Sequence, residues 1–116
     1  MAEFYIPTDK EIAEKTCGLI IADLSYNWSI QDLASESHVT VYTLRRIFKR
    51  QIKLGISDFI VKAKMEKAKE LLITTNNTIQ MIAETVGYVE GNNFQKRFKK
   101  ITGKTPGEWR KNSGQL

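Results

Sequence analysis

The sequence predicts an all-α protein of about seven helices, in which two helix-turn-helix subdomains are joined by a long central helix. Apolar residues recur at helical spacing along most of the 116-residue chain. Ser and Thr residues stand just before several of these stretches, where helix N-caps are expected. One pattern of cap, apolar positions and turn residue occurs twice, 49 residues apart. Such a repeat predicts two similar small units within one chain.

The composition is that of an ordinary folded domain. Hydrophobic residues make up 41% of the chain, which argues against disorder. No apolar run approaches the roughly 20 residues that a membrane span needs, and the start at Met1–Tyr5 lacks the basic and then apolar pattern of a secretory signal. Cys17 is the only cysteine and His38 the only histidine, so we expect no internal disulfide, no metal cluster and no cofactor. A reducing cytoplasm suits such a chain.

The first subdomain is predicted over residues 8–56, after an N-terminal tail of residues 1–7. Thr8 and Glu11 have the spacing of a capping box, and the apolar stripe behind them predicts a helix to about Ser25.

A helix-turn-helix pattern follows within the same subdomain. Ser29 is placed to cap a short helix that ends near His38, and Thr40 is placed to cap the next helix. The turn needs a residue that tolerates left-handed backbone angles, and His38 stands where glycine would be usual. We expect His38 to be structural, because a lone histidine has no ligand or nucleophile partner here.

The central helix and the second subdomain come next. Gly55 is predicted to end the preceding helix, and Ser57 to cap a long connecting helix over residues 57–75. The second subdomain is predicted over 76–112, and residues 113–116 form a tail. It repeats the first subdomain in two parts. At an offset of 49, the residues Ser29, Ile30, Leu33, Ala34 and His38 recur as Thr78, Ile79, Ile82, Ala83 and Gly87. At an offset of 50, the residues Leu44, Phe48 and Lys49 recur as Phe94, Phe98 and Lys99. Gly103 is matched with Gly55, and the Thr105–Glu108 capping box opens a last helix whose Trp109 is expected to pack under this subdomain.

The charge is distributed unevenly. The chain carries a net charge of +5, but residues 1–40 hold two basic and seven acidic side chains. Two windows, 41–53 and 92–104, each hold five basic residues and no acidic one. A single basic helix is often only a solvated face. Its occurrence in both repeats favours a nucleic-acid footprint instead.

The residues that would contact nucleic acid follow from helical phase. In the first window Leu44, Ile47 and Phe48 are expected to face the core, which leaves the polar residues outside. The candidates for base reading are Tyr42, Thr43, Arg45, Arg46, Asn92, Gln95 and Lys96. The candidates for phosphate contact are Thr40, Lys49, Arg50, Lys53, Lys99 and Lys100. The helix N-termini at Thr40, Ser57 and Thr105 could also receive phosphates through backbone N–H groups.

A long motif in the second half resembles the signature of AraC/XylS-type transcription regulators. It consists of Ile79, Ile82, Ala83, Gly87, Tyr88, Phe94, Phe98, Lys99, Gly103, Thr105, Pro106 and Arg110 at their present spacing. The resemblance covers about residues 15–112 and implies two recognition helices, about 41–53 and 92–102, that read successive major-groove segments. By position it implies that Tyr42, Arg45, Arg46, Asn92, Gln95 and Lys96 face bases. The chain departs from the family pattern at His38, at Lys64 (generally arginine) and at Gly91-Asn92-Asn93.

The expected function is sequence-specific DNA binding in bacterial transcription regulation, in the cytoplasm and on the nucleoid. Double-stranded DNA and RNA polymerase are the expected partners. Two forms of the protein stay open: a stand-alone regulator, and the DNA-binding part of a longer protein with an upstream sensor or receiver domain. Two alternatives stay open: a non-specific nucleic-acid binder and a helical protein-interaction module. We do not expect an enzyme, because the sequence has no nucleophile–base pair, carboxylate dyad or phosphate loop. The operator, the signal, the oligomeric state and the choice between activation and repression also stay open.

Overall fold

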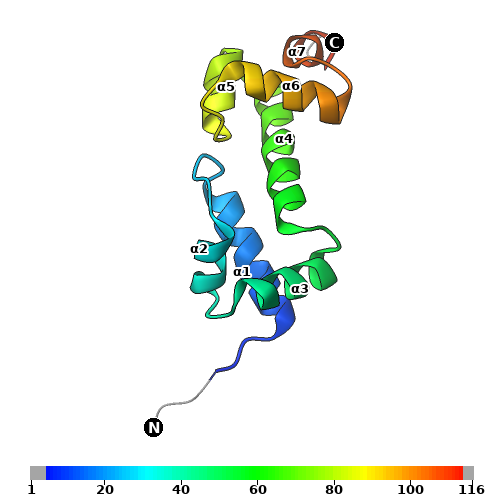
Figure 1. Ribbon diagram of the computed structural model, residues 1–116. Coiled ribbons are helices and arrows are strands. Elements are labelled where there is room, and N and C mark those ends of the chain that lie inside the picture. The colour runs from blue at the N-terminus through cyan, green and yellow to red at the C-terminus, as the bar shows by residue number, and fades with distance from the viewer. Residues whose placement is uncertain (1–4, 114–116) are drawn as a thin grey trace. The chain divides into compact units, whose positions relative to one another are not determined.

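The computed structural model describes residues 5–113, which form seven α-helices (Figure 1). They are α1 (Asp9–Ala22), α2 (Ile30–Glu36), α3 (Val41–Ile52), α4 (Ile56–Thr74), α5 (Ile79–Thr85), α6 (Gly91–Thr102) and α7 (Pro106–Ser113). Residues 5–113 contain no strand. The predicted all-α fold of about seven helices is therefore confirmed. The outer parts of the two predicted tails, residues 1–4 and 114–116, lie outside the described residues.

Backbone contacts divide the chain into two compact units. The first unit runs up to Asp23 and continues over Trp28–Ile60. The second unit combines the short connection Leu24–Asn27 with the chain from Val61 onward. The long helix α4 thus contributes its first turn to the first unit and the rest to the second.

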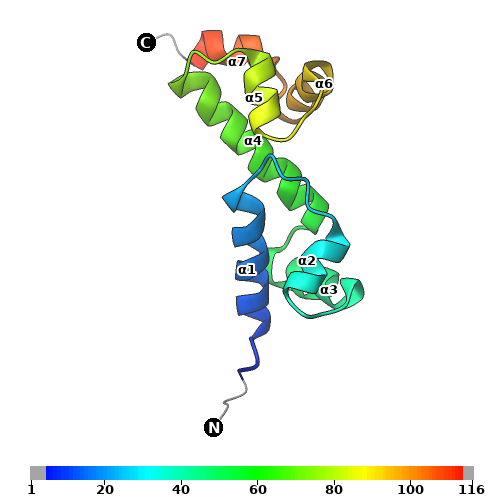
Figure 2. The same cartoon turned by 90° about the vertical axis from the view of Figure 1, so that its left-hand side faces the viewer.

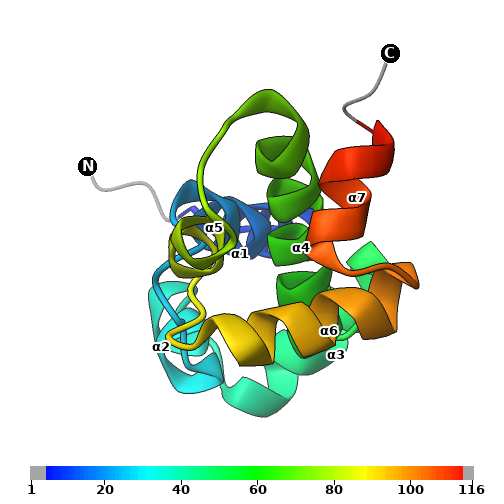
Figure 3. The same ribbon diagram turned by 90° about the horizontal axis from the view of Figure 1, so that it is seen from above.

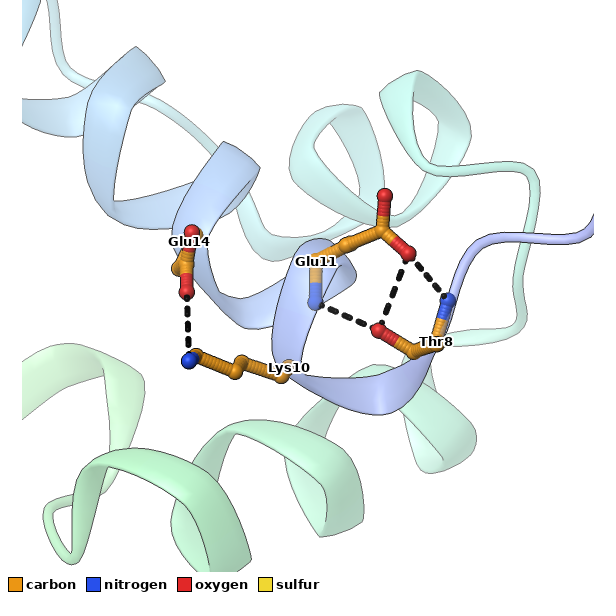
Figure 4. A network of polar contacts seen from close by, with 4 residues as sticks. All are labelled: Thr8, Lys10, Glu11 and Glu14. Atoms are coloured by element: carbon orange, nitrogen blue, oxygen red, sulfur yellow. Dashed lines mark hydrogen bonds and ion pairs between the residues drawn. The ribbon is translucent and has the colours of Figure 1, made fainter.

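The first helix begins with the predicted capping box (Figure 4). The Glu11 backbone N–H donates to Thr8 Oγ1 at 3.1 Å, and the Thr8 N–H donates to Glu11 Oε1 at 3.1 Å. These bonds satisfy backbone donors that the helix itself leaves unpaired, and a cap of this kind contributes about 1 kcal/mol. Lys10 and Glu14 add an exposed ion pair at 3.9 Å between the first two turns of the helix.

The first unit is held together by α3, which packs against α1 (Figure 2). Its core is mostly apolar and comes from all of its helices. The buried apolar residues are Ile12, Ala13, Ile20, Leu33, Ala34, Leu44, Ile47, Phe48 and Ile56, and the polar residues Thr16 and Ser37 of the same unit are buried as well. Phe48 has no exposed surface and meets Phe59 edge-on, with ring centroids 5.4 Å apart. The predicted inward side of the first recognition helix is therefore confirmed.

In the second unit α5, α6 and α7 gather around the C-terminal part of α4 (Figure 3). The core contains Met65, Ala68, Leu72, Ile82, Ala83, Val86, Phe94 and Phe98. Trp109 of α7 packs against this core and meets Phe98 edge-on at 5.8 Å, as predicted. Arg110 fastens α7 further, since its guanidinium donates to the carbonyl oxygens of Leu72 and Asn77 at 3.0 and 2.7 Å.

The boundary between α3 and α4 differs from the prediction. The left-handed residue that ends α3 is Lys53, with φ of 72°, and not Gly55. Because α4 begins at Ile56, Ser57 lies inside its first turn and is not its N-cap. In the second unit Gly103, with φ of 84°, ends α6 in the same way. The repeat therefore pairs Gly103 with Lys53, because α3 and α6 both have 12 residues and end at the same point.

Both helix-turn-helix turns contain the expected left-handed residue. His38 has φ of 56° and Gly87 has φ of 87°, each two residues beyond the end of a seven-residue helix. The structural role predicted for His38 is thus confirmed. The second turn is one residue longer before the next helix begins, also as predicted.

Candidate nucleic-acid interface

The first recognition helix, α3, begins at a well-formed cap. The Thr43 backbone N–H donates to Thr40 Oγ1 at 3.1 Å, and the Thr40 hydroxyl donates to Thr43 Oγ1 at 2.9 Å. Thr43 is half-buried, and its hydroxyl oxygen accepts from Thr40. Thr40 is exposed, beside the first free N–H groups of the helix.

A continuous exposed row runs along the outer side of α3. Its members are three or four residues apart, which places them on one helical face. They are Tyr42, Arg45, Arg46, Lys49, Arg50 and the C-cap residue Lys53. The Tyr42 side chain is 74% exposed, more than is usual for an aromatic side chain. Five cations and one aromatic ring therefore share this face, and no acidic residue interrupts it.

The second recognition helix, α6, presents a matching row at an offset of 50. Its members are Asn92, Gln95, Lys96, Lys99 and Lys100, all exposed. Phe94 and Phe98 anchor the opposite side of the helix and have no exposed surface. The row differs from that of α3 at its beginning, where amides replace a tyrosine and an arginine. All the predicted site residues of this helix thus lie on one outer face.

The start of α6 also differs from that of α3. The N-cap is Glu90, whose side chain makes no capping hydrogen bond. Val89, just before it, is 87% exposed. An acidic side chain without a capping bond therefore stands where α3 has the Thr40 cap.

Arg97 is a cation of α6 to which the sequence reasoning gave no role. It stands at the position of Ile47 in the first repeat, which is buried, yet Arg97 is exposed. With Tyr88, Asn93, Lys96 and Lys100 it lines a hollow of about 470 Å³. Burial raises the pKa of the Tyr88 phenol, and the nearby Arg97 guanidinium opposes that rise. The sequence feature that points to Arg97 is its place in the acid-free window 92–104.

In the first unit a second hollow, of about 460 Å³, lies between α3 and the start of α4. Arg45 and Lys49 line it together with Gly55, Ile56 and Ser57. Two cations, the Asp58 carboxylate and the first turn of a 19-residue helix thus share one concave surface. The cations and the helix N-terminus favour an anionic group there, and the Asp58 charge opposes it.

The turn before α6 rests on a buried lysine. Lys64 is 7% exposed, and its Nζ donates to Asn27 Oδ1 at 2.6 Å. Asn27 Nδ2 in turn donates to the carbonyl oxygen of Gly87 at 3.2 Å. The Lys64 ammonium also lies 5.4 Å from the centroid of the Tyr88 ring. Burial lowers the pKa of Lys64.

Within residues 5–113, no group of three or more His, Cys, Asp or Glu side chains is placed to hold a metal ion. Over the same stretch, no helix is long and apolar enough to cross a membrane. Cys17 is a half-buried free thiol whose pKa is raised by burial.

Comparison with known proteins agrees with this geometry. A family described as "Helix-turn-helix domain" matches residues 33–112. The chain is 31% identical over 94 residues to the HTH-type transcriptional activator FapR of Escherichia coli. The aligned region covers 81% of this chain and 36% of FapR. It is 33% identical over 100 residues to the raffinose operon transcriptional regulatory protein RafR of Pediococcus pentosaceus, covering 83% of this chain and 36% of RafR. The chain thus spans about a third of the length of these curated relatives.

Solved structures show the same fold. The C-terminal domain of AraT, a response regulator from Geobacillus stearothermophilus, superposes with a TM-score of 0.83 at 30% identity, covering 87% of this chain and 84% of that one. The C-terminal domain of the two-component response regulator yesN from Fusobacterium nucleatum gives a TM-score of 0.76 at 30% identity, covering 87% of this chain and 96% of that one.

Proposed function

This chain belongs to the AraC-type family of helix-turn-helix domains, and on that premise we propose that it binds DNA sequence-specifically to regulate bacterial transcription. The observation that carries the proposal is the doubled exposed row. Two helices of equal length, at the same place in two repeated units, present polar and cationic side chains on their outer faces. A helix of this kind fits the major groove and reads base edges with its N-terminal part.

The two helices would read different chemistry. In α3, Arg45 and Arg46 are suited to guanine, and the exposed Tyr42 ring is suited to a thymine methyl group. The Thr43 methyl group is also suited to a thymine methyl group. In α6, Asn92 and Gln95 are suited to adenine and Lys96 to guanine.

The remaining cations would bind the DNA backbone. Lys49, Arg50 and Lys53 follow the base-reading residues of α3, and Lys99 and Lys100 follow those of α6. Thr40 and the first turn of α4 would add backbone N–H groups as phosphate donors. Arg97 joins this set because it lines the same hollow as Lys96 and Lys100. These contacts would give affinity without sequence preference.

The rest of the proposal concerns a longer protein. Because the relatives are about three times the length of the matched region, the DNA-binding unit would act with a sensor or receiver domain elsewhere in the chain or on a partner. The name of FapR contains the word activator, which favours activation through contact with RNA polymerase in the cytoplasm. The chemistry proposed for this chain is binding, and no catalytic step is assigned to it.

Selection of bound sites from a random DNA pool tests the proposal. We expect a bipartite motif without inverted symmetry, one half for each recognition helix. Binding without any enriched motif would favour a non-specific nucleic-acid binder. No binding at all would favour a protein-interaction module.

A further inference from the structure

The buried faces of α1 and α4 follow the same pattern, with one exception. In α1 the buried residues are Ile12, Ala13, Thr16 and Ile20; in the part of α4 that belongs to the second unit, at a constant shift of 52 positions, they are Lys64, Met65, Ala68 and Leu72. In three of the four pairs both residues are small or apolar. The Thr16 hydroxyl in one of these pairs donates to the Ile12 carbonyl oxygen of its own helix. The fourth pair sets a lysine against an isoleucine. Lys64 therefore occupies a position where the first unit of this chain has an isoleucine.

A lysine in such a place needs polar partners, because burial of an ammonium group is costly. Lys64 donates to Asn27 Oδ1 at 2.6 Å and lies 5.4 Å from the Tyr88 ring. Both partners are uncharged. These contacts therefore fix the position of the ammonium group but stabilise the fold less than a well-formed ion pair would. An apolar residue could fill the same space and bind neither partner.

The Asn27 amide connects this lysine to the turn before α6. Its oxygen accepts from Lys64, and its nitrogen donates to the Gly87 carbonyl at 3.2 Å. A Cβ on Gly87 would lie 2.7 Å from the Leu24 carbonyl oxygen and 2.8 Å from Lys64 Nζ. The turn is thus pressed closely against Lys64 and the Leu24–Asn27 connection, all within the second unit.

The turn leads directly into the second recognition helix. Tyr88, next to Gly87, packs its ring against Phe94 of α6 with centroids 5.6 Å apart. The N-cap Glu90 makes no side-chain capping bond, whereas Thr40 caps α3 at 3.1 Å. The first turn of α6 thus lacks the side-chain cap that α3 has, and it is approached by the Gly87–Tyr88 turn and by Gln80, whose amide nitrogen donates to the Val89 carbonyl oxygen at 3.4 Å.

We propose that Asn27 and Lys64 are positioning residues for base reading by α6. They hold the Gly87–Tyr88 turn, and through it they place Asn92 and Gln95 at the bases. The inference rests on the proposed function, since it assigns these residues an effect on one half of the DNA site. It also gives a role to the lysine that departs from the arginine of the family pattern.

The test uses the full chain and a DNA site selected by the wild-type protein, with affinities measured on the intact site and on sites with one half scrambled. Asn27→Ala is the main variant, because Asn27 is exposed and its removal leaves no cavity in the core. Lys64→Met and Lys64→Arg test the lysine itself. Asn76→Ala and Lys62→Met are the matched controls, at an exposed asparagine and at an exposed lysine of the same helix. Thermal unfolding of every variant is recorded alongside.

We expect scrambling of the α6 half to weaken wild-type binding by about tenfold or more. In Asn27→Ala and Lys64→Met the same scrambling should weaken binding by only about twofold, because the α6 half is then read poorly. Discrimination at the α3 half should be unchanged in both. Lys64→Arg should retain discrimination at the α6 half, because a guanidinium can also donate to the Asn27 oxygen. Both controls should behave as wild type.

Two results would overturn the inference alone: undiminished discrimination at the α6 half in Asn27→Ala, or an equal loss at both halves. If Lys64→Met does not fold, Asn27→Ala still decides, because it keeps the core intact. A wild-type protein that enriches no sequence at all would overturn the proposed function and this inference with it. The wild-type selection therefore separates the two failures.

Discussion

Lys53 and Gly103 occupy the same position in the two repeated units, one residue after a 12-residue helix, and both have left-handed backbone angles, with φ of 72° and 84°. In each case the N–H of the left-handed residue bonds the carbonyl four residues earlier, at Lys49 and at Lys99. Glycine adopts these angles freely, whereas lysine does so at a cost of about 1 kcal/mol. The first unit therefore keeps a cation at a strained position at the end of its recognition helix.

Lys53→Gly should change stability and DNA binding in opposite directions. We expect the free energy of unfolding to rise by about 0.5–1 kcal/mol, because the backbone strain is relieved. Affinity for DNA should fall, because a phosphate contact is lost. Urea unfolding and DNA titration measure the two effects, and Lys53→Met serves as the control that removes the charge but keeps the strain. A Lys53→Gly protein less stable than wild type would contradict this view of the position.

Arg46→Ala should cost about 1–3 kcal/mol of binding free energy on the preferred site and relax the choice of base at one position. Arg46 is exposed in the first half of α3, where a recognition helix meets base edges. Lys53→Met, at the end of the same helix, should weaken all sequences about equally. Titrations on matched and singly mismatched sites compare the two. Identical behaviour of the two variants would show that the division into base-reading and phosphate-binding residues is wrong.

The affinity for DNA should fall steeply with salt. The two exposed rows hold Lys49, Arg50, Lys53, Lys99 and Lys100 as candidate phosphate contacts. Five such contacts would give a slope of log affinity against log salt of roughly −4 to −5. Titrations between low and physiological salt measure it. A slope near zero would exclude a mainly electrostatic contact with the DNA backbone.

Glu108 should make the stability of the second unit dependent on acid pH. The Thr105 backbone N–H donates to its carboxylate at 2.9 Å, and this bond, followed by the Thr105 side chain and the charges of Lys99 and Lys104, lowers its pKa below the usual 4.5. A carboxyl whose pKa is lower in the folded protein stabilises it above pH 4.5, and this contribution disappears as the pH falls through the lower folded value.

The melting temperature of Glu108→Gln should therefore depend less on pH below 4.5 than that of wild type. Glu36→Gln, at an exposed acidic residue of the first unit, is the control and should follow wild type. Thermal unfolding between neutral pH and pH 3 records both variants. Parallel curves for wild type and Glu108→Gln would show that the capping box at α7 carries no such linkage.

The sequence predicted most of the fold because its signals are local. The Thr8–Glu11 and Thr105–Glu108 capping boxes, the left-handed residue at His38 and the inward face of α3 all depend on neighbours within a few residues. The predicted end of α3 was wrong for a related reason. A glycine at position 55 was a stronger local signal than Lys53, and only the length of the folded helix shows where the chain turns.

The contacts that the sequence did not predict join distant segments. Lys64 and Asn27 are 37 residues apart, and Asn27 and Gly87 are 60 apart. No periodicity or cap relates such residues, and a lysine in a helix suggests an exposed side chain rather than a core position. The exposure of Arg97, at the position where the first repeat has the buried Ile47, likewise follows from the folded surface of the second unit. The assignment of individual residues to bases and phosphates stays a prediction.

The most direct test of the central claim is a hydroxyl-radical footprint of the purified protein on its selected site. If α3 and α6 both read DNA, two successive major-groove segments should be protected, with centres about 10 base pairs apart. The two protected segments should differ in sequence and show no inverted symmetry, because the two rows carry different side chains. Protection confined to one major-groove segment would show that only one helix reads DNA and would contradict the account.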